Sequence, residues 1–161
     1  MVAIEINETN EMAGSKSMFV NLTISSTNAN LSPVIDLKRI NFSKNIDNIR
    51  KDLFNLLSKL KKQGKKVVGY GATSKSTTVN NYFQINSDLI ECIYDTTPIK
   101  HNTYAPGTNI PVLSYDNFQK SKPDYVLLYA WNHKEEIMKK EKDFMSNNRK
   151  WITYIPKVEI F

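Results

Sequence analysis

The hydrophobic residues of this 161-residue chain follow two different spacings. Within residues 17–25 apolar side chains occupy alternate positions, and this period of two predicts a half-buried strand. A polar loop follows, and apolar residues then recur at steps of three and four from Ile46 to Leu60, which predicts an amphipathic helix. Ser43 is expected to cap the start of this helix and Gly64 to end it.

Beyond Lys65 the pattern changes to short continuous apolar runs, at residues 66–70, 89–94, 110–113, 125–130 and 151–155. Helical segments fit between these runs at residues 74–83, 115–120 and 133–146. Continuous apolarity is typical of strands that are buried on both faces of a parallel sheet. The alternation of strands and helices therefore predicts an α/β fold, a Rossmann-like three-layer αβα sandwich with a mainly parallel sheet, preceded by the N-terminal strand and amphipathic helix.

The composition agrees with a globular protein of one domain, because 40% of the residues are hydrophobic and 24% are charged. The apolar runs are too short for a bilayer span and the first residues lack the pattern of a signal peptide, so a cytoplasmic location without a membrane partner is expected. Cys92, the single cysteine, lies in an apolar run and is predicted to be core; a disulfide framework and a thiolate-rich zinc site are excluded.

The net charge of +6 raises the question of a nucleic-acid partner. The lysines, however, are spread over helical segments and are not interleaved with aromatic residues, so a solvated face is expected and no nucleic acid. The same positive field favours an anionic small ligand such as a diphosphate.

The stretch VVGYGATSKSTT resembles phosphate-binding loops without completing one. A P-loop needs a glycine where Ser74 stands, and the dinucleotide fingerprint needs a third glycine after Gly69 and Gly71. The two glycines allow positive φ angles and close approach of a ligand, and Thr73 or Ser74 could cap the next helix. Free backbone N–H groups together with Lys75 predict an anion-binding turn. The alternative is a tight turn that needs glycine only for its geometry.

The usual strand order 3-2-1-4-5 would place the strand ending in Tyr70 beside the strand ending in Ala130. Ligands of such sheets bind where the order reverses, in the crevice outside the carboxyl ends of the strands. The loops GYGATSK and AWNHKEE, although far apart in sequence, are therefore predicted to meet in one crevice.

The second loop carries its own candidates. Asn132 is expected to cap the following helix, with Glu135 completing a capping box. Trp131 and His133 are candidates for stacking on a base or bonding to a ligand oxygen, although His133 is equally explained as an exposed first-turn residue. No acidic cluster accompanies His133 or His101, so no metal site is expected.

Asp95 follows the second of the predicted buried strands, 26 residues after Gly69, where dinucleotide-binding folds keep an acidic residue for ribose hydroxyls. The alternative is a turn aspartate in YDTTP. The loop HNTYAPGTNIPV that follows is rich in turn formers, with a type II turn expected at Pro106 and Gly107. No catalytic constellation is found, so the residues alone predict a ligand-binding Rossmann-like domain with no catalytic residue.

Four segments, GYGATSKSTTVNNYF, YDTTPIKHNTYAPGTNIPV, PDYVLLYAWNHKEEI and WITYIPKVEIF, resemble in order the C-terminal domain of S-adenosylmethionine-dependent sugar C-methyltransferases. Enzymes of this family methylate a ring carbon of nucleotide-linked deoxysugars. The resemblance covers about residues 42–161, the expected Rossmann-like domain. NEMAGSKSMFVNL looks like the stretch that joins this domain to the preceding one, so residues 1–41 are expected to be an N-terminal joining arm.

The resemblance implies that a full-length relative also has a zinc-binding domain and a domain that binds S-adenosylmethionine. This chain is accordingly expected to hold no cofactor itself, S-adenosylmethionine and structural zinc belonging to those other domains. Its implied partners are a nucleotide-diphosphate sugar and a methyltransferase domain or subunit that binds S-adenosylmethionine. The whole enzyme would deprotonate a carbon beside a sugar ketone and move the methyl group by direct displacement, with its base outside this chain, so the isolated chain is expected to be inactive.

The matching positions of the family motifs are Gly69, Tyr70, Gly71, Ala72, Lys75, Asp95, Pro98, Lys100, Tyr104, Pro106, Gly107, Ala130, Trp131 and Asn132. The chain departs from the usual motif residues at Ser76, Thr97 and Asn102. The expected substrate-binding residues are Gly69, Tyr70, Gly71, Ala72, Thr73, Ser74, Lys75, Asp95, Lys100, Tyr104, Trp131, Asn132 and His133. Two alternatives stay open: a nucleotide- or dinucleotide-binding regulatory module, and a structural domain that packs on a partner.

Overall fold

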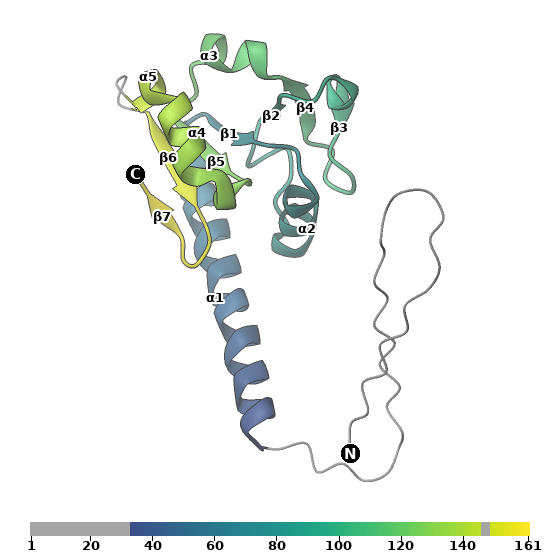
Figure 1. Cartoon of the computed structure of the whole chain (residues 1–161), viewed down its shortest axis with the longest axis vertical. Helices are drawn as coiled ribbons and strands as arrows, with labels where there is room; N and C mark the ends of the chain where they lie inside the picture. Colours follow the sequence, from purple (N-terminus) through teal and green to yellow (C-terminus); the bar gives the residue numbers. More distant parts are fainter. Residues whose placement is uncertain (1–32, 146–148) are drawn as a thin grey trace, which may run out of the picture. The chain divides into compact units, whose positions relative to one another are not determined.

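The computed structural model describes residues 33–145 and 149–161 (Figure 1). The chain divides into two compact units, residues 1–41 and residues 42–161, and every described element except the start of the first helix belongs to the second unit. The strand predicted within residues 17–25 lies outside the described residues.

The first described element is helix α1, Pro33–Lys62. The prediction that Ser43 caps this helix is wrong, because Ser43 lies inside it. The helix can extend back from Ser43 because no glycine or proline interrupts residues 34–45. Pro33 suits the first helical position, because its fixed φ is helical and an N–H at that position would have no acceptor within the helix.

The predicted end of α1 at Gly64 is confirmed. Gly64 has a φ of +69°, and its N–H donates to the carbonyl oxygen of Lys61 at 2.9 Å. The N–H of Lys65 donates to the carbonyl oxygen of Leu60 at 3.0 Å. These two bonds form a Schellman motif, in which a left-handed residue satisfies the last helical carbonyls.

The sheet has seven strands in the order β3-β4-β2-β1-β5-β6-β7. Their bounds are β1 Val67–Tyr70, β2 Ile93–Asp95, β3 Thr103–Tyr104, β4 Pro111–Ser114, β5 Tyr125–Leu128, β6 Lys150–Thr153 and β7 Glu159–Ile160. The five central strands are parallel and confirm the predicted order 3-2-1-4-5. The antiparallel edge strands β3 and β7 were not predicted, because two residues are too few to show a hydrophobic period.

Helices lie on both faces of the sheet, as predicted. The remaining elements are α2 Ser74–Phe83, η1 Pro98–Lys100, η2 Tyr115–Asn117, α3 Phe118–Ser121, η3 Trp131–His133, α4 Lys134–Lys140 and α5 Lys142–Met145. Side chains of α1 and α2 belong to one hydrophobic cluster and those of α3, α4 and α5 to the other. Along β1, Val67 belongs to the first cluster and Val68 to the second, because successive side chains of a strand point to opposite faces.

Beyond α1, three predicted elements differ by more than two residues or are divided. The strand expected at residues 89–94 is confined to Ile93–Asp95. Leu89 lies in a turn instead, in which its N–H donates to the carbonyl oxygen of Asn86. The helix expected at residues 115–120 is a 3₁₀ turn followed by the short helix α3. The helix expected at residues 133–146 is interrupted at Glu141 between α4 and α5.

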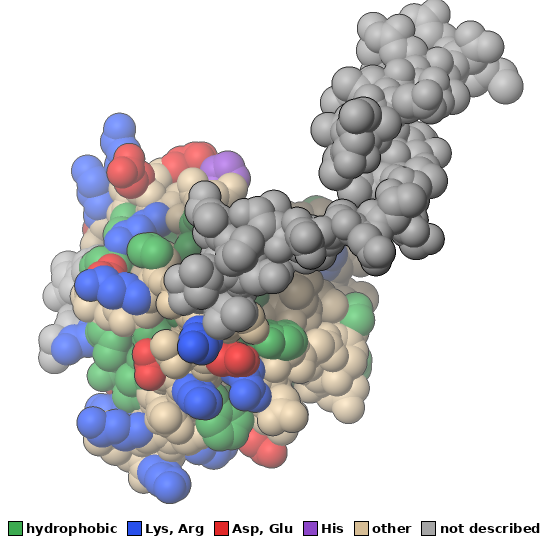
Figure 2. Space-filling model, turned by 90° about the horizontal axis from the view of Figure 1, so that it is seen from below, with side chains coloured by type: hydrophobic (Ala, Val, Ile, Leu, Met, Phe, Trp, Pro, Cys, Tyr) green, Lys and Arg blue, Asp and Glu red, His purple; other side chains and the backbone are tan. Residues whose placement is uncertain are grey.

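Cys92 is buried, which confirms its predicted place in the core, and burial raises the pKa of its thiol. Lys and Arg side chains alternate with acidic, apolar and polar ones on the face drawn in Figure 2. No helix within residues 33–145 and 149–161 is long and apolar enough to cross a membrane.

Candidate ligand-binding site at the carboxyl edge of the sheet

The turns after β1 and β5 lie side by side, as predicted. The two strands pair in parallel, with Tyr70 opposite Leu128, and the N–H of Tyr129 donates to the carbonyl oxygen of Tyr70 at 3.1 Å. Beyond them, a Cβ atom added to Gly71 would lie 3.5 Å from the Cβ atom of Ala130, which is ordinary van der Waals contact. The order of the strands reverses at this point, so the two turns lie where ligands of such sheets bind.

The two glycines of the first turn have different roles. Gly71 has a φ of +90°, the left-handed region that favours glycine. Gly69 lies within β1 and has no positive φ. A Cβ atom there would lie 2.6 Å from Cε2 of Tyr129 and 3.0 Å from Cγ1 of Ile93. The expectation of a positive φ at Gly69 is therefore wrong, and the absence of a side chain there makes room for the buried ring of Tyr129. Contact of Gly69 with a ligand stays a prediction.

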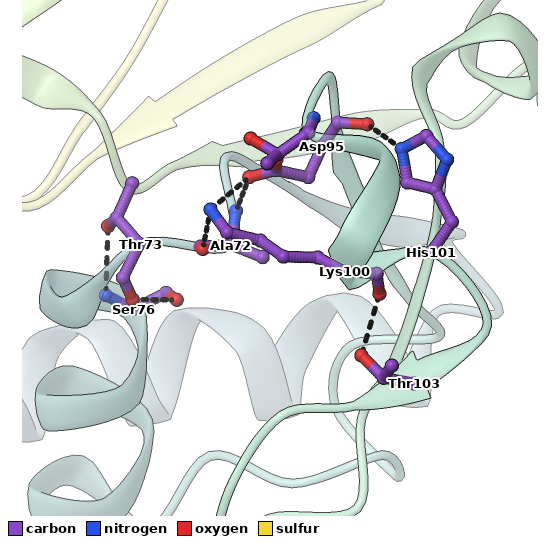
Figure 3. A network of polar contacts seen from close by, with 8 residues as sticks. Ala72, Thr73, Ser76, Asp95, Lys100, His101 and Thr103 are labelled. Carbon is purple, nitrogen blue, oxygen red and sulfur yellow. Dashed lines mark hydrogen bonds and ion pairs between the residues drawn. The ribbon is translucent and has the colours of Figure 1, made fainter.

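Helix α2 begins with a capped first turn, drawn in Figure 3. Thr73 is the N-cap, and its Oγ1 accepts the N–H of Ser76 at 3.3 Å. In return, Oγ of Ser76 donates to the carbonyl oxygen of Thr73 at 2.6 Å. Of the two predicted caps, Thr73 rather than Ser74 fills the role.

The anion-binding turn has fewer open amides than predicted. The N–H of Ala72 donates to Oδ2 of Asp95 at 2.7 Å, and the N–H of Ser76 is used by the cap. Within the described part of the chain, the amides of Ser74 and Lys75 have no acceptor. The side chains of these two residues are exposed. The open donors are therefore confined to the first turn of α2, where the helix carries a partial positive charge.

Asp95 joins the turn after β1 to the segment after β2 (Figure 3). Besides the Ala72 amide, its carboxylate accepts the N–H of Thr97 at 2.8 Å on Oδ1. Lys100 donates to the carbonyl oxygen of Ala72 at 2.8 Å and lies 3.4 Å from Oδ2 of Asp95. The bond to Thr97, two residues on, is the one expected of a turn aspartate, so it supports the alternative interpretation of YDTTP as a turn.

The charge state of Asp95 follows from these contacts. Burial raises the pKa of the carboxyl group, but hydrogen bonds from Thr97 and Ala72 and the charge of Lys100 outweigh burial and hold the pKa below its usual value. Asp95 is therefore ionised at neutral pH, and Lys100 offsets its negative charge beside the open amides.

His101 also belongs to this network, although no sequence pattern predicts it. Its Nε2 lies 2.8 Å from the carbonyl oxygen of Asp95. Thr103 donates its hydroxyl to the carbonyl oxygen of Lys100 at 2.6 Å, so the segment that carries Lys100 is held at both ends (Figure 3). No periodic pattern marks a side chain that binds a backbone carbonyl oxygen, so this contact could not be predicted from the sequence.

Two predicted site residues lie away from the turns. Tyr70 belongs to the cluster on the α3–α5 face, and its hydroxyl donates to Oε1 of Glu141 at 3.0 Å. Its position in the strand, one residue after Gly69, directs it to that face. Tyr104 is exposed on β3 and pairs with Pro111, the first residue of β4, toward the amino ends of the parallel strands.

The turn after β5 is a 3₁₀ turn, η3, in which the N–H of His133 donates to the carbonyl oxygen of Ala130 at 2.9 Å. The prediction that Asn132 caps the next helix is wrong, because the cap position of α4 falls on His133 and no side chain bonds there. Asn132 and His133 are exposed, and His133 lies 3.7 Å from Glu136. Trp131 packs against the α1–α2 cluster. The 3₁₀ turn moves the start of α4 one residue beyond the predicted one.

A second polar cluster, which no sequence pattern indicated, surrounds the buried carboxylate of Glu141 on the α3–α5 face. Glu141 has 1% of its surface exposed. Its Oε1 accepts the hydroxyls of Tyr70 at 3.0 Å and Tyr115 at 2.6 Å, and its Oε2 accepts Nε2 of Gln119 at 2.8 Å. Burial and the nearby carboxylate raise the pKa of Tyr70 far above its ordinary value and that of Tyr115 to about 12. The four side chains come from separate elements, so no local pattern reveals them.

Among the residues that the structure describes, no three His, Cys, Asp or Glu side chains lie close enough together to hold a metal ion. The carboxyl edge has groups that can bind an anion. They are the backbone amides of Ser74 and Lys75 and the ammonium group of Lys75, and Asp95 and Lys100 fix the turn that leads to them.

Replacing Asp95 by Asn is expected to lower the free energy of unfolding by about 2 kcal/mol, because the amide that replaces one carboxylate oxygen cannot accept a second N–H. The pKa of Asp95 is lowered in the folded protein, so its contribution is present above the unfolded value near 3.8 and is lost as the pH falls through the folded value. Urea unfolding at neutral and acid pH measures both effects. The exposed Asp52→Asn serves as control, and equal losses in the two variants would contradict the prediction.

Comparison with known proteins gives a family and one curated relative. The family model for the C-methyltransferase C-terminal domain matches residues 30–156. The curated protein C-methyltransferase NovU of Streptomyces niveus is 32% identical over 119 residues, which are 74% of this chain and 28% of that protein. The chain thus spans little more than a quarter of the length of this relative.

Proposed function

This chain belongs to the C-methyltransferase C-terminal domain family, and on that premise we propose that it is the substrate side of an S-adenosylmethionine-dependent enzyme that methylates a nucleotide-diphosphate-linked deoxysugar. In this role it binds the nucleotide sugar and not the methyl donor. The chain would act in the cytoplasm in deoxysugar biosynthesis, with a methyltransferase domain or subunit as its partner.

The observation that carries the proposal is the first turn of α2. The amides of Ser74 and Lys75 have no acceptor among the described residues, and Lys75 adds an exposed ammonium group. Open N–H groups at a helix N-terminus bind phosphate, since the donors and the helix dipole both favour negative charge. The turn lies beside Ala130, where the strand order reverses, so a diphosphate bound there could extend along the turn that carries Trp131, Asn132 and His133.

Asp95 acts in this proposal as a positioning residue. Its carboxylate holds the Ala72 amide, and Lys100 holds the Ala72 carbonyl oxygen, so the backbone that leads into α2 is fixed from both sides. The charge of Lys100 also offsets the carboxylate that would otherwise repel a diphosphate.

The methyl group would come from S-adenosylmethionine, and the residues of this edge do not fit that cofactor. An acidic residue in the position of Asp95 would have to accept hydroxyls of a ribose, but the Asp95 side chain is only 6% exposed and each of its oxygens already accepts a backbone N–H group of the protein. The same observation weighs against the alternative of a dinucleotide-binding module. The tasks left to this chain are to bind the diphosphate and to orient the sugar toward the partner.

A specific observation also supports the structural alternative, a domain that packs on a partner. Ile99 on η1 and Tyr104 on β3 are 88% and 66% exposed, and a partner that covered them would remove apolar surface from water.

Lys75→Ala is expected to weaken binding of a nucleoside diphosphate-sugar several-fold. The substitution removes the positive charge that would face the diphosphate, and it leaves the fold intact because the side chain is exposed. Isothermal titration of the chain with a nucleoside diphosphate, a nucleoside diphosphate-sugar, NAD and S-adenosylmethionine measures the preference. Lys120→Ala, at an exposed lysine of α3, is the matched control.

Preferential binding of the diphosphate-sugar, weakened in Lys75→Ala alone, supports the proposal. Tighter binding of NAD or S-adenosylmethionine contradicts it, and no binding of any of the four supports the structural alternative.

A further inference from the structure

Two adjoining depressions lie at the opposite, amino edge of the sheet. The larger has a volume of about 490 Å³, within the range of small-molecule sites. It lies between the end of α2 and the turn before β4, and its lining includes Asn80, Asn81, Asn86, Ser87, Thr108 and Asn109. A helix that follows a parallel strand runs back toward the amino edge, and residues 107–109 precede the first residue of β4. The groove is therefore separate from the candidate site at the carboxyl edge.

The larger depression is polar and uncharged. Amides, hydroxyls and backbone make up its described lining together with one apolar residue, Ile85, and the lining holds no Asp, Glu, Lys or Arg, although 24% of the chain is charged. Amides offer donors and acceptors together, which is the pairing that the hydroxyl groups of a neutral polyol need. Two of its lining residues have a left-handed backbone: Gln84, the C-cap of α2, with a φ of +59°, and Asn109, with a φ of +54°.

Asn80 supplies an unsatisfied donor in this lining. The side chain is fully buried, and its Oδ1 accepts the hydroxyl of Tyr129 at 2.6 Å. Its Nδ2 is buried without a hydrogen-bond partner in the described part of the chain. A buried donor without an acceptor is costly, so the structure points to an acceptor that is not part of the protein.

The smaller depression, of about 130 Å³, is basic and partly aromatic. Its lining is Arg50, Lys51, Phe54, Asn55, Phe83 and Gln84, and Gln84 also lines the larger depression. Nε of Arg50 is a second buried donor without a hydrogen-bond partner among the described residues. The carboxylate of Asp47 lies 3.7 Å from it and accepts the hydroxyl of Tyr82 at 3.4 Å. With Lys51 the depression keeps a positive charge, and an arginine fork suits a phosphoryl group.

We propose that the two depressions form one site for a phosphorylated sugar, with the sugar hydroxyls in the amide-lined groove and the phosphoryl group against Arg50 and Lys51. Three buried side-chain polar atoms of the described residues lack a partner, and two of them, on Arg50 and Asn80, belong to this lining. The proposal is independent of the function proposed for the carboxyl edge, since it uses none of the same residues.

Titration of the isotope-labelled chain with glucose 6-phosphate, glucose and inorganic phosphate, followed by NMR, tests the proposal. Glucose 6-phosphate is expected to bind at least about tenfold more tightly than either part alone and to shift the amide signals of Gln84 and Asn109. Arg50→Gln should weaken its binding roughly tenfold by removing the charged donor, and Ser87→Ala several-fold by removing a hydroxyl. Ser87→Ala should leave phosphate binding unchanged. Lys59→Gln, at an exposed lysine of the same helix, is the matched control.

Crossed variants separate this site from the one at the carboxyl edge. Arg50→Gln should weaken glucose 6-phosphate and spare the nucleoside diphosphate-sugar, whereas Lys75→Ala should do the reverse. Equal affinities for phosphate and glucose 6-phosphate, shifts centred on Ser74 and Lys75, or no shift at millimolar concentrations would each overturn the inference.

Discussion

Gly69→Val is expected to destabilise the domain by about 3 kcal/mol or more, one of the two largest effects predicted for a single substitution. The first added carbon would lie 2.6 Å from the ring of Tyr129 and 3.0 Å from Ile93, both fully buried, so neither can move aside. Overpacking of a dense core costs roughly 1–3 kcal/mol, and the two further methyl groups of valine add to the strain. Urea unfolding followed by circular dichroism measures the loss.

Gly64→Asn is the matched control for this substitution. Gly64 has a left-handed φ but nothing within 4 Å of an added Cβ atom, and asparagine tolerates this conformation better than other residues with a side chain. A small loss at Gly64 with a large loss at Gly69 separates crowding from backbone strain. If Gly69→Val were as stable as the parent chain, the close packing of Tyr129 on β1 would be wrong.

Glu141→Ala is expected to cost roughly 3 to 5 kcal/mol of unfolding free energy. The substitution leaves three donors without their acceptor, the hydroxyls of Tyr70 and Tyr115 and the amide of Gln119. Unsatisfied buried donors cost about 1–3 kcal/mol each, and partial access of water reduces the sum. Glu141→Gln should cost less, about 1 to 2 kcal/mol, because an oxygen remains for the tyrosines while the charge is lost. Urea unfolding of both variants measures the difference.

The same cluster predicts a loss of stability at high pH. The pKa of Tyr115 is about 12 in the folded protein against an ordinary value of 10.0, so its contribution is present below about pH 10 and is lost as the pH rises toward 12. Tyr115→Phe should remove this part of the pH dependence. Glu135→Ala, at an exposed residue of α4, is the control for both experiments, and a loss there equal to that of Glu141→Ala would contradict the assigned role.

At the carboxyl edge, the topology was predicted correctly, but it did not reveal which backbone amides are available to a ligand. Strand order placed the turn after Tyr70 beside the turn after Ala130, and the structure confirms this. The amide of Ala72, which the sequence offered to a ligand, is instead occupied by Asp95. The position of Asp95 after β2 was visible in the sequence, but the direction of its carboxylate depends on Thr97 and Lys100 as well.

Features that depend on neighbours in sequence could be predicted for this protein. The central parallel strands follow from continuous apolar runs, α2 from its polar segment and the Thr73 cap, and the end of α1 from Gly64, because each depends on residues within a turn or two. The start of α1 was missed because Ser43 is also acceptable inside a helix.

Only the tertiary structure decided which side chains meet. It brought Glu141 to Tyr70, packed Tyr129 on Gly69, and let Gln84 line both the depression that holds Arg50 and the one that holds Asn80. These contacts join residues that are distant in sequence and lie on different elements, so their geometry depends on the packing of helices on the sheet and not on any local pattern. The sequence therefore determined the fold and the meeting of the turns after β1 and β5, and packing determined which backbone amides at this edge have no acceptor within the described residues.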